Sequence, residues 1–284
     1  MEENRPDPLI GDDELFVRMT PTDRLQHIML IASFSLIILT GFPLLLHDVK
    51  VFKWILSTKT SHIVRGALHR AGAVGLVLTI AWHMVTTVFT PAGRKNFREL
   101  IPRPRDIRDA VQIFGHNLGL TRFLQRRGVL TKFFRKHRFW LFDQPPLVGR
   151  YNFIEKFEYW AVAWGSAVMI LTGFFMWFEN LSLRFFPLWV HNVFIVIHDY
   201  ESILAFLSIL IWHMYNVHLN PDVFPMSKVW LNGLITGKEL RLHHPLEYRQ
   251  ILQARINRPD QALQPPPIVP ADGGPEKNPE EKRA

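Results

Sequence analysis

Histidines recur inside apolar stretches of this sequence at two related spacings. The segments "IAWHMV" and "LIWHMY" place His83 and His213 in nearly the same context. His69 precedes His83 by fourteen residues, and His198 precedes His213 by fifteen. On a helix these spacings correspond to about 21 to 23 Å along the axis and to side-chain directions about 40° to 60° apart. Both histidines of each helix can therefore face one interior.

Imidazole is costly in hydrocarbon unless it binds something, so these histidines are candidate ligands. If the two helices run in the same direction, His69 meets His198 at one depth, and His83 meets His213 at another. Two facing imidazoles are the axial donors of a b-type haem iron, with the flat macrocycle between them. We therefore predict two haem b groups in series. His27 lies at the depth of His83, so either residue could share the second iron with His213. Hydrogen bonding within helix interfaces is the alternative reading of all five histidines.

Four stretches of about twenty residues contain almost no Lys or Arg, as membrane-spanning helices require. The sequence is 48% apolar and 20% charged, and the charge is concentrated outside these stretches. The predicted fold class is an all-α, polytopic membrane protein with a four-helix bundle. Four buried helices of a soluble protein would instead have to share one large core. The predicted spans are Ile28–Leu46, His69–Phe89, Tyr159–Phe178 and Asn192–Val217.

Two further sequence matches indicate that the first pair of spans is duplicated in the second pair. "ILTGF" occurs at 38–42 and again at 170–174, an offset of 132 residues. The "WHM" triplets are offset by 130 residues, and His69 and His198 by 129. Matches in the same order at nearly one offset predict a duplicated helical hairpin. Small residues in these spans could make room for a macrocycle or for close helix packing. They are Gly41, Gly75, Gly165 and Gly173.

The distribution of basic residues predicts how the chain is oriented. The connection at 91–150 holds fourteen Lys and Arg against four acidic residues, so it should be cytoplasmic, together with both termini. The net charge of +8 is thereby explained without a nucleic-acid partner. A polar, acidic leader precedes the first span, and we expect no cleavable signal sequence. The predicted location is the bacterial inner membrane, with lipid around all four spans.

The chain divides into six predicted segments. Within the basic loop, "RDAVQIFGHNLG" and "TRFLQRRGVLTKFFRKHRFWLF" could form surface helices. After the last span, "WLNGLITGKELRLHHPLEYRQILQAR" has the pattern of one amphipathic helix on the membrane surface. The segments are an N-terminal cytoplasmic segment (1–23), a first hairpin (24–90), the basic loop (91–150), a second hairpin (151–218), an amphipathic cytoplasmic segment (219–258) and a disordered tail (259–284).

Several motifs between Arg24 and Ile251 resemble the cytochrome b (gamma) subunit of membrane-bound formate dehydrogenases, which has relatives in nickel-iron hydrogenases. "DRLQH" resembles its Arg-x-x-His opening, and "ALHRAGAVG" its second-helix ligand segment. "YNFIEKFEYW" resembles the entry to its third helix, "VIHDYESILAFLSILIWHMY" its fourth helix, and "HHPLEYRQI" its cytoplasmic end. The basic loop and the proline-rich tail depart from that pattern.

The resemblance implies a di-haem protein with particular ligands. His69 and His198 would bind the outer haem, while His27 and His213 would bind the inner one. The duplicated pattern instead favours His83 opposite His213, and both possibilities stay open. Residues at the membrane margins could pair with haem propionates or with lipid headgroups. They are Arg24, Arg65 and Arg70.

The resemblance also implies a site for menaquinone or ubiquinone beside the inner haem. It would involve Tyr151, Asn152 and Glu155, in which the amide could donate to a quinone carbonyl and the carboxylate could exchange protons. The alternative is that these residues cap the third helix.

The predicted function is electron transfer through two haems between a periplasmic redox partner and the quinone pool. The sequence contains no cysteine, which excludes cysteine-held iron–sulfur clusters and Cys-attached haem on this chain. An outward-facing iron–sulfur or c-type cytochrome subunit is therefore expected as partner in a quinone-linked oxidoreductase complex. The direction of electron flow stays open, because a quinol-oxidising subunit would look alike. A histidine-lined metal transporter and a structural membrane anchor are the alternatives from other classes.

Overall fold

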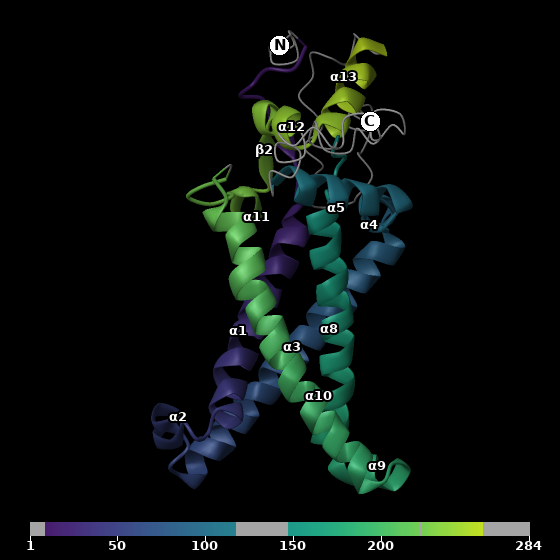
Figure 1. The fold of residues 1–284 in the computed structure, drawn as a ribbon. Coiled ribbons are helices and arrows are strands. Elements are labelled where there is room, and N and C mark those ends of the chain that lie inside the picture. The colour runs from purple at the N-terminus through teal and green to yellow at the C-terminus, as the bar shows by residue number, and fades with distance from the viewer. Residues whose placement is uncertain (1–8, 118–146, 222, 258–284) are drawn as a thin grey trace, which may run out of the picture.

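The computed structural model describes residues 9–117, 147–221 and 223–257, and its centre is a bundle of four long helices (Figure 1). They are α1 (Pro21–Leu45), α3 (Lys59–Phe89), α8 (Phe153–Trp177) and α10 (Leu188–Leu207) with its continuation to Leu219. Each is long and apolar enough to cross a membrane, with mean hydropathy between 1.5 and 2.3. The predicted all-α, four-span bundle is confirmed.

The helices begin earlier than the predicted spans because polar capping turns precede the apolar residues. Thr20 and Asp23 form a capping box at the start of α1, and Thr58 and Ser61 do so at the start of α3. In consequence α3 begins ten residues before His69, which was the predicted first residue of that span. Hydropathy marks where a helix enters hydrocarbon, whereas capping marks where it begins.

Two hairpins make up the bundle, and each turns through a short helix. α2 (Lys50–Ile55) joins α1 to α3, and α9 (Glu179–Phe185) joins α8 to α10. The hairpins diverge toward α2 and α9, which we call the hairpin end (Figure 1). Glycines let α1 and α3 pack closely, since a Cβ on Gly72 would lie 3.0 Å from Ile37 Cγ1 and one on Gly75 would lie 2.7 Å from Ser33 Oγ.

The fourth span changes helix type along its length. After α10 it continues as two π-helical segments, η1 (Ser208–His213) and η2 (Tyr215–Leu219). A π-helical turn contains one more residue than an α-helical turn. The repeat offset changes from 129 to 130 residues between His198 and His213, and η1 lies in that interval. The extra residue of the second hairpin is therefore accommodated in the helix itself.

The other end of the bundle, the capped end, carries a small folded unit that we call the cap (residues 9–20 and 229–257). β1 (Leu15–Val17) pairs antiparallel with β2 (Leu234–Thr236), and α12 (Gly237–His243) and α13 (Pro245–Asn257) follow. Its buried apolar residues are Ile10, Phe16, Ile235, Leu240 and Tyr248.

The cap corrects the prediction of one amphipathic helix after the last span. α11 (Val229–Asn232) ends at Gly233, whose φ of 79° is the left-handed conformation that glycine adopts most readily. Thr236 then caps α12, and Pro245 begins α13. The glycine, the strand and the proline divide the segment. The predicted disordered tail lies outside the described residues.

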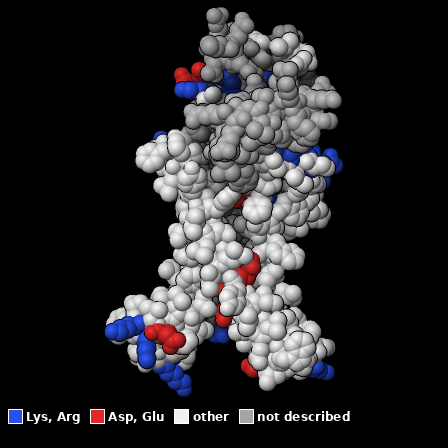
Figure 2. Space-filling model, in the orientation of Figure 1, with Lys and Arg blue, Asp and Glu red and all other residues white. Residues whose placement is uncertain are grey.

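Two surface helices follow the second span at the capped end: α4 (Pro91–Leu100) and α5 (Pro104–Asn117). α5 confirms the helix predicted for "RDAVQIFGHNLG" as far as Asn117, whereas the rest of that segment and the second loop segment lie outside the described residues. Lys156 Nζ of α8 contacts both carboxylate oxygens of Asp106 at 3.0 and 2.9 Å, and Trp160 Nε1 donates to the carbonyl of Leu100. These contacts fix both surface helices to α8. On the face in Figure 2, Lys and Arg gather at the two ends of the molecule, and the bundle between them is mostly uncharged.

Candidate functional site

The structure brings four of the five candidate histidines together as two facing pairs. The ring centres of His69 and His198 are 6.5 Å apart, and those of His27 and His213 are 6.4 Å apart. Imidazole nitrogens bind metals at about 2.0 to 2.1 Å, and the ring centre lies about 1 Å behind the nitrogen, so two rings on one metal have centres about 6 Å apart. Both pairs thus have the spacing of axial ligands. We call them the hairpin-end pair and the capped-end pair.

His69 is oriented by a threonine of the neighbouring helix. Thr40 Oγ1 lies 3.1 Å from His69 Nδ1 and 2.6 Å from the carbonyl oxygen of Leu36. The hydroxyl has one hydrogen, which it donates to that carbonyl, so its oxygen accepts from the Nδ1–H of the imidazole. Nε2 then carries the free lone pair. The contact selects the tautomer that a metal-binding Nε2 requires.

His198 has the equivalent arrangement in the second hairpin. Thr172 Oγ1 lies 2.9 Å from His198 Nδ1 and donates to the carbonyl of Val168 at 2.8 Å. Thr40 and Thr172 occupy the same position in the two copies of "ILTGF". The repeated motif therefore positions the repeated histidine.

The glycines of the "ILTGF" motif make room for the imidazole rings of the candidate ligands. A Cβ on Gly41 would lie 3.3 Å from His69 Cε1, and one on Gly173 would lie 3.2 Å from His198 Cε1. Both distances are tighter than ordinary contact. Gly165 has another neighbour, because its Cβ would lie 2.8 Å from Glu201 Oε1. Of the four glycines noted in the sequence, two contact candidate ligands.

The capped-end pair has different partners. His213 Nδ1 lies 3.2 Å from Glu158 Oε2, and Asn216 Nδ2 donates to the other carboxylate oxygen at 3.1 Å. A carboxylate accepts, so Nδ1 carries the hydrogen and Nε2 the lone pair. His27 Nδ1 is buried and has no hydrogen-bond partner among the described residues. Its ring lies between those of His213 and Trp230, at 6.4 and 6.3 Å.

His83 is not brought opposite His213. Its Nδ1 lies 3.1 Å from Gln26 Oε1, and its Nε2 lies 3.2 Å from the hydroxyl of Tyr159. Both nitrogens are thus engaged with other side chains, and the position that the repeat assigned to His83 is taken by His27 of α1. The repeat could not indicate this, because the first span contributes a histidine to one pair and the third span contributes none.

The three predicted quinone residues lie where the cap meets α8. Asn152 Oδ1 accepts from the backbone N–H of Glu155 at 2.8 Å, and Glu155 Oε2 accepts from that of Asn152 at 2.7 Å. This is the capping box that the sequence offered as the alternative. Tyr151 lies between the guanidinium groups of Arg18 and Arg150, at 5.1 and 5.7 Å from its ring centre. The capping contacts leave the Asn152 amide nitrogen and Glu155 Oε1 for other partners, and Oε1 is 3.7 Å from Arg18 Nη2.

The three predicted propionate-binding arginines lie near the histidine pairs. Arg24 is one turn before His27, and its Nη1 donates to a backbone carbonyl of α11 at 2.6 Å. Arg65 is one turn before His69, and its Nη1 donates to a backbone carbonyl of α1 at 2.9 Å. In both, Nε is buried without a hydrogen-bond partner among the described residues. Arg70 instead lies 5.7 Å from the ring centre of Trp177.

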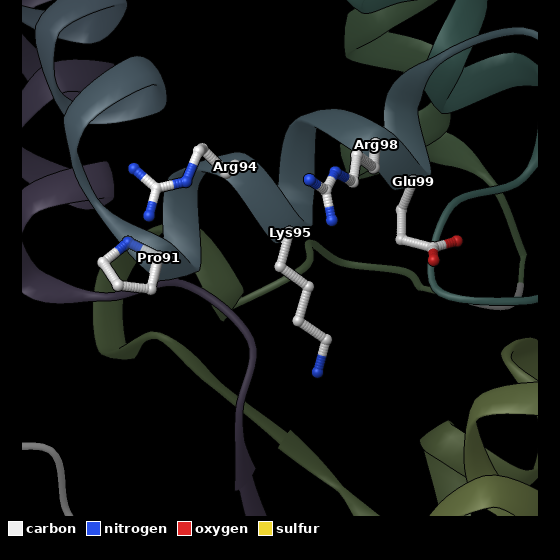
Figure 3. Close-up of a pocket in the computed structure, with 5 residues that line it drawn as sticks. All are labelled: Pro91, Arg94, Lys95, Arg98 and Glu99. Carbon is white, nitrogen blue, oxygen red and sulfur yellow. The ribbon is translucent and has the colours of Figure 1, made fainter.

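A basic pocket of about 480 Å³ lies on α4 at the capped end (Figure 3). It is lined by Pro91, Arg94, Lys95, Arg98 and Glu99, none of which was a candidate residue. Arg94 Nη1 donates to the carbonyl of Val88 at 2.9 Å. The pocket directly follows the second span, where positive charge is expected at a membrane margin.

Within the described residues, no group of three or more His, Cys, Asp or Glu is arranged to hold a bare metal ion. Each facing pair supplies two donors, which is the number that a haem iron takes from the protein when both axial positions are filled. Three of the four rings have a tautomer set by a neighbour. The donor set and its spacing therefore fit haem, although sequence reasoning did not identify the orienting residues. Thr40 and Thr172 were visible in the "ILTGF" repeat, whereas no pattern marked Glu158.

Comparisons with known proteins agree with the geometry at the level of the protein type. No protein-family model matches the chain. It is 22% identical to the formate dehydrogenase cytochrome b556 subunit of Haemophilus influenzae over 247 residues, which cover 87% of this chain and 88% of that protein. It is 29% identical to the nitrate-inducible formate dehydrogenase cytochrome b556(Fdn) subunit of Escherichia coli over 111 residues, or 39% and 49% of the two chains. A subunit of the same name in Shigella flexneri matches equally. The chain is thus a four-span protein that is similar over most of its length to one formate dehydrogenase cytochrome b556 subunit, and over 39% of its length to two others.

Proposed function

We propose that this chain is a membrane cytochrome b subunit that carries electrons through two b-type haems. The observation that supports this most directly is the pair of facing imidazoles at each of two depths, with ring centres 6.5 and 6.4 Å apart. His69 and His198 would hold one iron, and His27 and His213 the other. His83 is excluded from our ligand set because both of its nitrogens have side-chain partners.

The chain's own residues determine how the irons are held. Each haem, when bound, supplies an iron centre that gains and loses one electron. Thr40 and Thr172 keep the Nδ1 hydrogen on the hairpin-end imidazoles, so that Nε2 donates. Glu158 does the same for His213 and, being anionic, also strengthens that ligand as a donor. Arg24 and Arg65 offer guanidinium groups to propionates near the two pairs, and Arg70 is the third candidate.

The quinone site is proposed at the capped end. Asn152, Glu155 and Tyr151 precede or begin α8, and Glu155 is three residues before Glu158, which contacts the capped-end pair. The free amide nitrogen of Asn152 can donate to a quinone carbonyl, and Glu155 can exchange protons. Menaquinone and ubiquinone both fit this chemistry.

The proposed orientation places the capped end in the cytoplasm of a bacterial cell and the hairpin end outside the inner membrane. The concentration of Lys and Arg in 91–150 supports it. The relatives are named as subunits of formate dehydrogenase, so we propose that a partner subunit with iron–sulfur clusters or c-type haem meets the hairpin end. Electrons would pass from that partner to quinone. A quinol-oxidising chain would use the same site in reverse.

The test is haem content after replacement of single histidines. The chain purified in mild detergent should contain about two haem b groups by pyridine haemochrome assay. His198→Ala and His213→Ala should each reduce this to about one, whereas His83→Ala should retain both. His62→Ala, which changes an exposed histidine in α3, is the matched control. A colourless protein after haem-replete expression would contradict the proposal. Loss of haem in His83→Ala but not in His27→Ala would instead assign the iron opposite His213 to His83.

A further inference from the structure

A polar cluster lies within the bundle, and the proposed electron path does not use it. It joins three spans: Gln26 of α1, His83 and Thr86 of α3, and Tyr159 of α8. Buried polar groups in a membrane bundle are costly and are therefore functional candidates. Each member here has a hydrogen-bond partner within the cluster.

The hydrogen bonds of the cluster run in one direction. Thr86 donates its hydroxyl hydrogen to the carbonyl of His83 at 3.0 Å, so its oxygen accepts from Gln26 Nε2 at 3.1 Å. This fixes the amide, and Gln26 Oε1 accepts from His83 Nδ1–H at 3.1 Å. His83 Nε2 is left as the acceptor for the hydroxyl of Tyr159 at 3.2 Å, with Thr87 Oγ1 at 3.4 Å beside it. The cluster therefore presents a base to a phenol.

The cluster adjoins the capped-end pair through two different helices. Gln26 immediately precedes His27, and Tyr159 immediately follows Glu158, whose carboxylate contacts His213. Successive side chains of a helix diverge by about 100°. The cluster thus occupies neighbouring helix faces at the depth of the capped-end pair.

Tyr159 also shares a face of α8 with a residue of the proposed quinone site. Glu155 and Tyr159 are four residues apart, so their Cβ atoms are about 5 to 6 Å apart on one side of the helix. The phenol oxygen donates one hydrogen bond and can accept another. A quinone headgroup on this face would have Tyr159 at one carbonyl oxygen and Glu155 toward the other.

We propose that Tyr159 and His83 are a proton-exchange pair for the quinone that is reduced or oxidised beside the capped-end histidines. This inference rests on the proposed function and adds the residues that move one of the two protons. Neither the facing histidine pairs nor the capping box at Asn152 assigns a role to this pair.

The proton balance in the reducing direction is one quinone, two electrons and two protons to one quinol. A haem held by His27 and His213 would supply the two electrons, one at a time. At one oxygen, the O–H bond of Tyr159 breaks as the quinol O–H bond forms, and the Nε2–H bond of a protonated His83 breaks as the phenol O–H bond forms again. Glu155 supplies the second proton at the other oxygen. His83 and Glu155 regain protons from the cytoplasmic side, and quinol oxidation reverses each step.

Charged groups around the pair are compatible with a proton reaching His83 from the capped end. Asp23 lies one turn before Gln26 on α1, at the capped end, and its carboxylate accepts from the backbone N–H of Thr20. Tyr151 precedes α8, and its ring lies 5.1 and 5.7 Å from the guanidinium groups of Arg18 and Arg150. Glu158 is directed to His213 and Asn216. A carboxylate thus lies at the start of α1, and the imidazole and the phenol contact each other within the bundle.

The test measures reduction of the haems by a short-chain quinol in the purified, haem-loaded chain, by stopped-flow absorbance. Menadiol and decyl-ubiquinol are both used, because the natural quinone is not assigned. Tyr159→Phe removes the hydroxyl alone, and His83→Gln keeps a polar side chain without the base. Each should slow quinol-driven reduction at least about tenfold, in keeping with the size of acid–base contributions. Haem content, the visible spectrum and reduction by dithionite should be unchanged.

A matched control and the pH dependence separate the possible outcomes. Tyr200→Phe changes a tyrosine of α10 that is 71% exposed, and it should leave the rate unchanged. The wild-type rate should rise with pH as His83 becomes neutral, and His83→Gln should lose that rise. Rates within twofold of wild type in both variants would overturn the inference alone, as would haem loss in Tyr159→Phe. A wild-type chain that dithionite reduces and neither quinol reduces would overturn the quinone role itself.

Discussion

At the scale of single residues, the candidate site depends on hydrogen bonds to the Nδ1 atoms of three of the four proposed ligands. Hydroxyl groups orient His69 and His198, and a carboxylate orients His213. Such contacts set which ring nitrogen carries the hydrogen, and their loss commonly weakens metal binding 10- to 100-fold. A histidine in the right place without this contact would spend part of its time as the wrong tautomer.

Replacement of the orienting hydroxyl should therefore weaken haem binding without removing a ligand. Thr172→Val keeps the shape of the side chain and loses the contact to His198, so the affinity for haem should fall about 10-fold or more. Titration of the haem-depleted protein with haemin measures this.

Thr79→Val is the control for that change, because Thr79 is equally buried and its hydroxyl donates to the carbonyl of Gly75 on the same helix. Haem affinity should be unaffected in this control. Equal haem affinity in Thr172→Val and wild type would show that packing against Gly173 alone orients His198.

At the scale of the elements, an ion pair connects a surface helix to a span. The side chains of Lys156 and Asp106 are 4% and 8% exposed, and they join α8 to α5. A buried pair of this kind contributes little net stability, but removal of one partner leaves an uncompensated charge that costs about 3 to 5 kcal/mol. The pair therefore determines the position at which α5 docks on α8, and it adds little to the stability of that docking.

This predicts opposite results for single and double replacements. Lys156→Met should lower the unfolding temperature in detergent and expose α4 and α5 to protease, whereas Lys156→Met combined with Asp106→Leu should recover most of the loss. Arg108→Met is the control, since the Arg108 side chain is 65% exposed and its pair with Asp109 should be worth about 1 kcal/mol or less. A double variant as unstable as the single one would assign the loss to Lys156 packing instead.

The sequence predicted the elements better than their contacts. Apolar stretches determined the four spans because hydrocarbon requires long uncharged helices, and the "ILTGF" and "WHM" matches indicated two similar hairpins. Helix starts were misplaced, since capping by Thr58 extends α3 beyond its apolar part. The pairing of His213 with His27 rather than His83 depends on how α1 packs beside the fourth span. That packing follows from the whole bundle and not from any repeat.

At the scale of the whole molecule, the cap connects segments that are far apart in the chain. Arg18 donates to Glu247 at 2.9 Å and to the carbonyl of Arg150, and Arg150 donates to Glu247 at 2.7 Å. His244 Nδ1 donates to the carbonyl of Gly149 at 2.9 Å. The segment before α1, the end of the basic loop and the segment after the fourth span thus meet at one place.

The cap should loosen in mild acid because of His244. Burial, reinforced by the charge of Arg18, lowers the pKa of His244 to about 4 from its usual 6.5. The unfolded state therefore binds more protons between these values, so the stability that neutral His244 contributes is present above pH 6.5 and is lost as the pH falls toward 4. The full effect is on the order of 3 kcal/mol.

Hydrogen exchange of α12 and α13 as a function of pH measures this loosening. His244→Gln should flatten the dependence between pH 6.5 and 4, because no imidazole is left to take up a proton. His243→Gln changes the neighbouring histidine and serves as the control. A pH dependence unchanged in His244→Gln would show that His244 does not cause the acid sensitivity of the cap.

The closure of the cap also has a consequence for how the protein is made. Arg18 and Glu247 are separated by 229 residues, and all four spans lie between them. As the ribosome delivers the chain, β1 emerges first and has no partner strand until β2 follows the last span out. The spans can enter the bilayer one hairpin at a time, but the cap can close only after the second hairpin has been synthesised. Closure of the cap therefore requires that both hairpins have been translated, and a chain truncated before β2 would present an unpaired strand edge to the quality-control proteases of the cell.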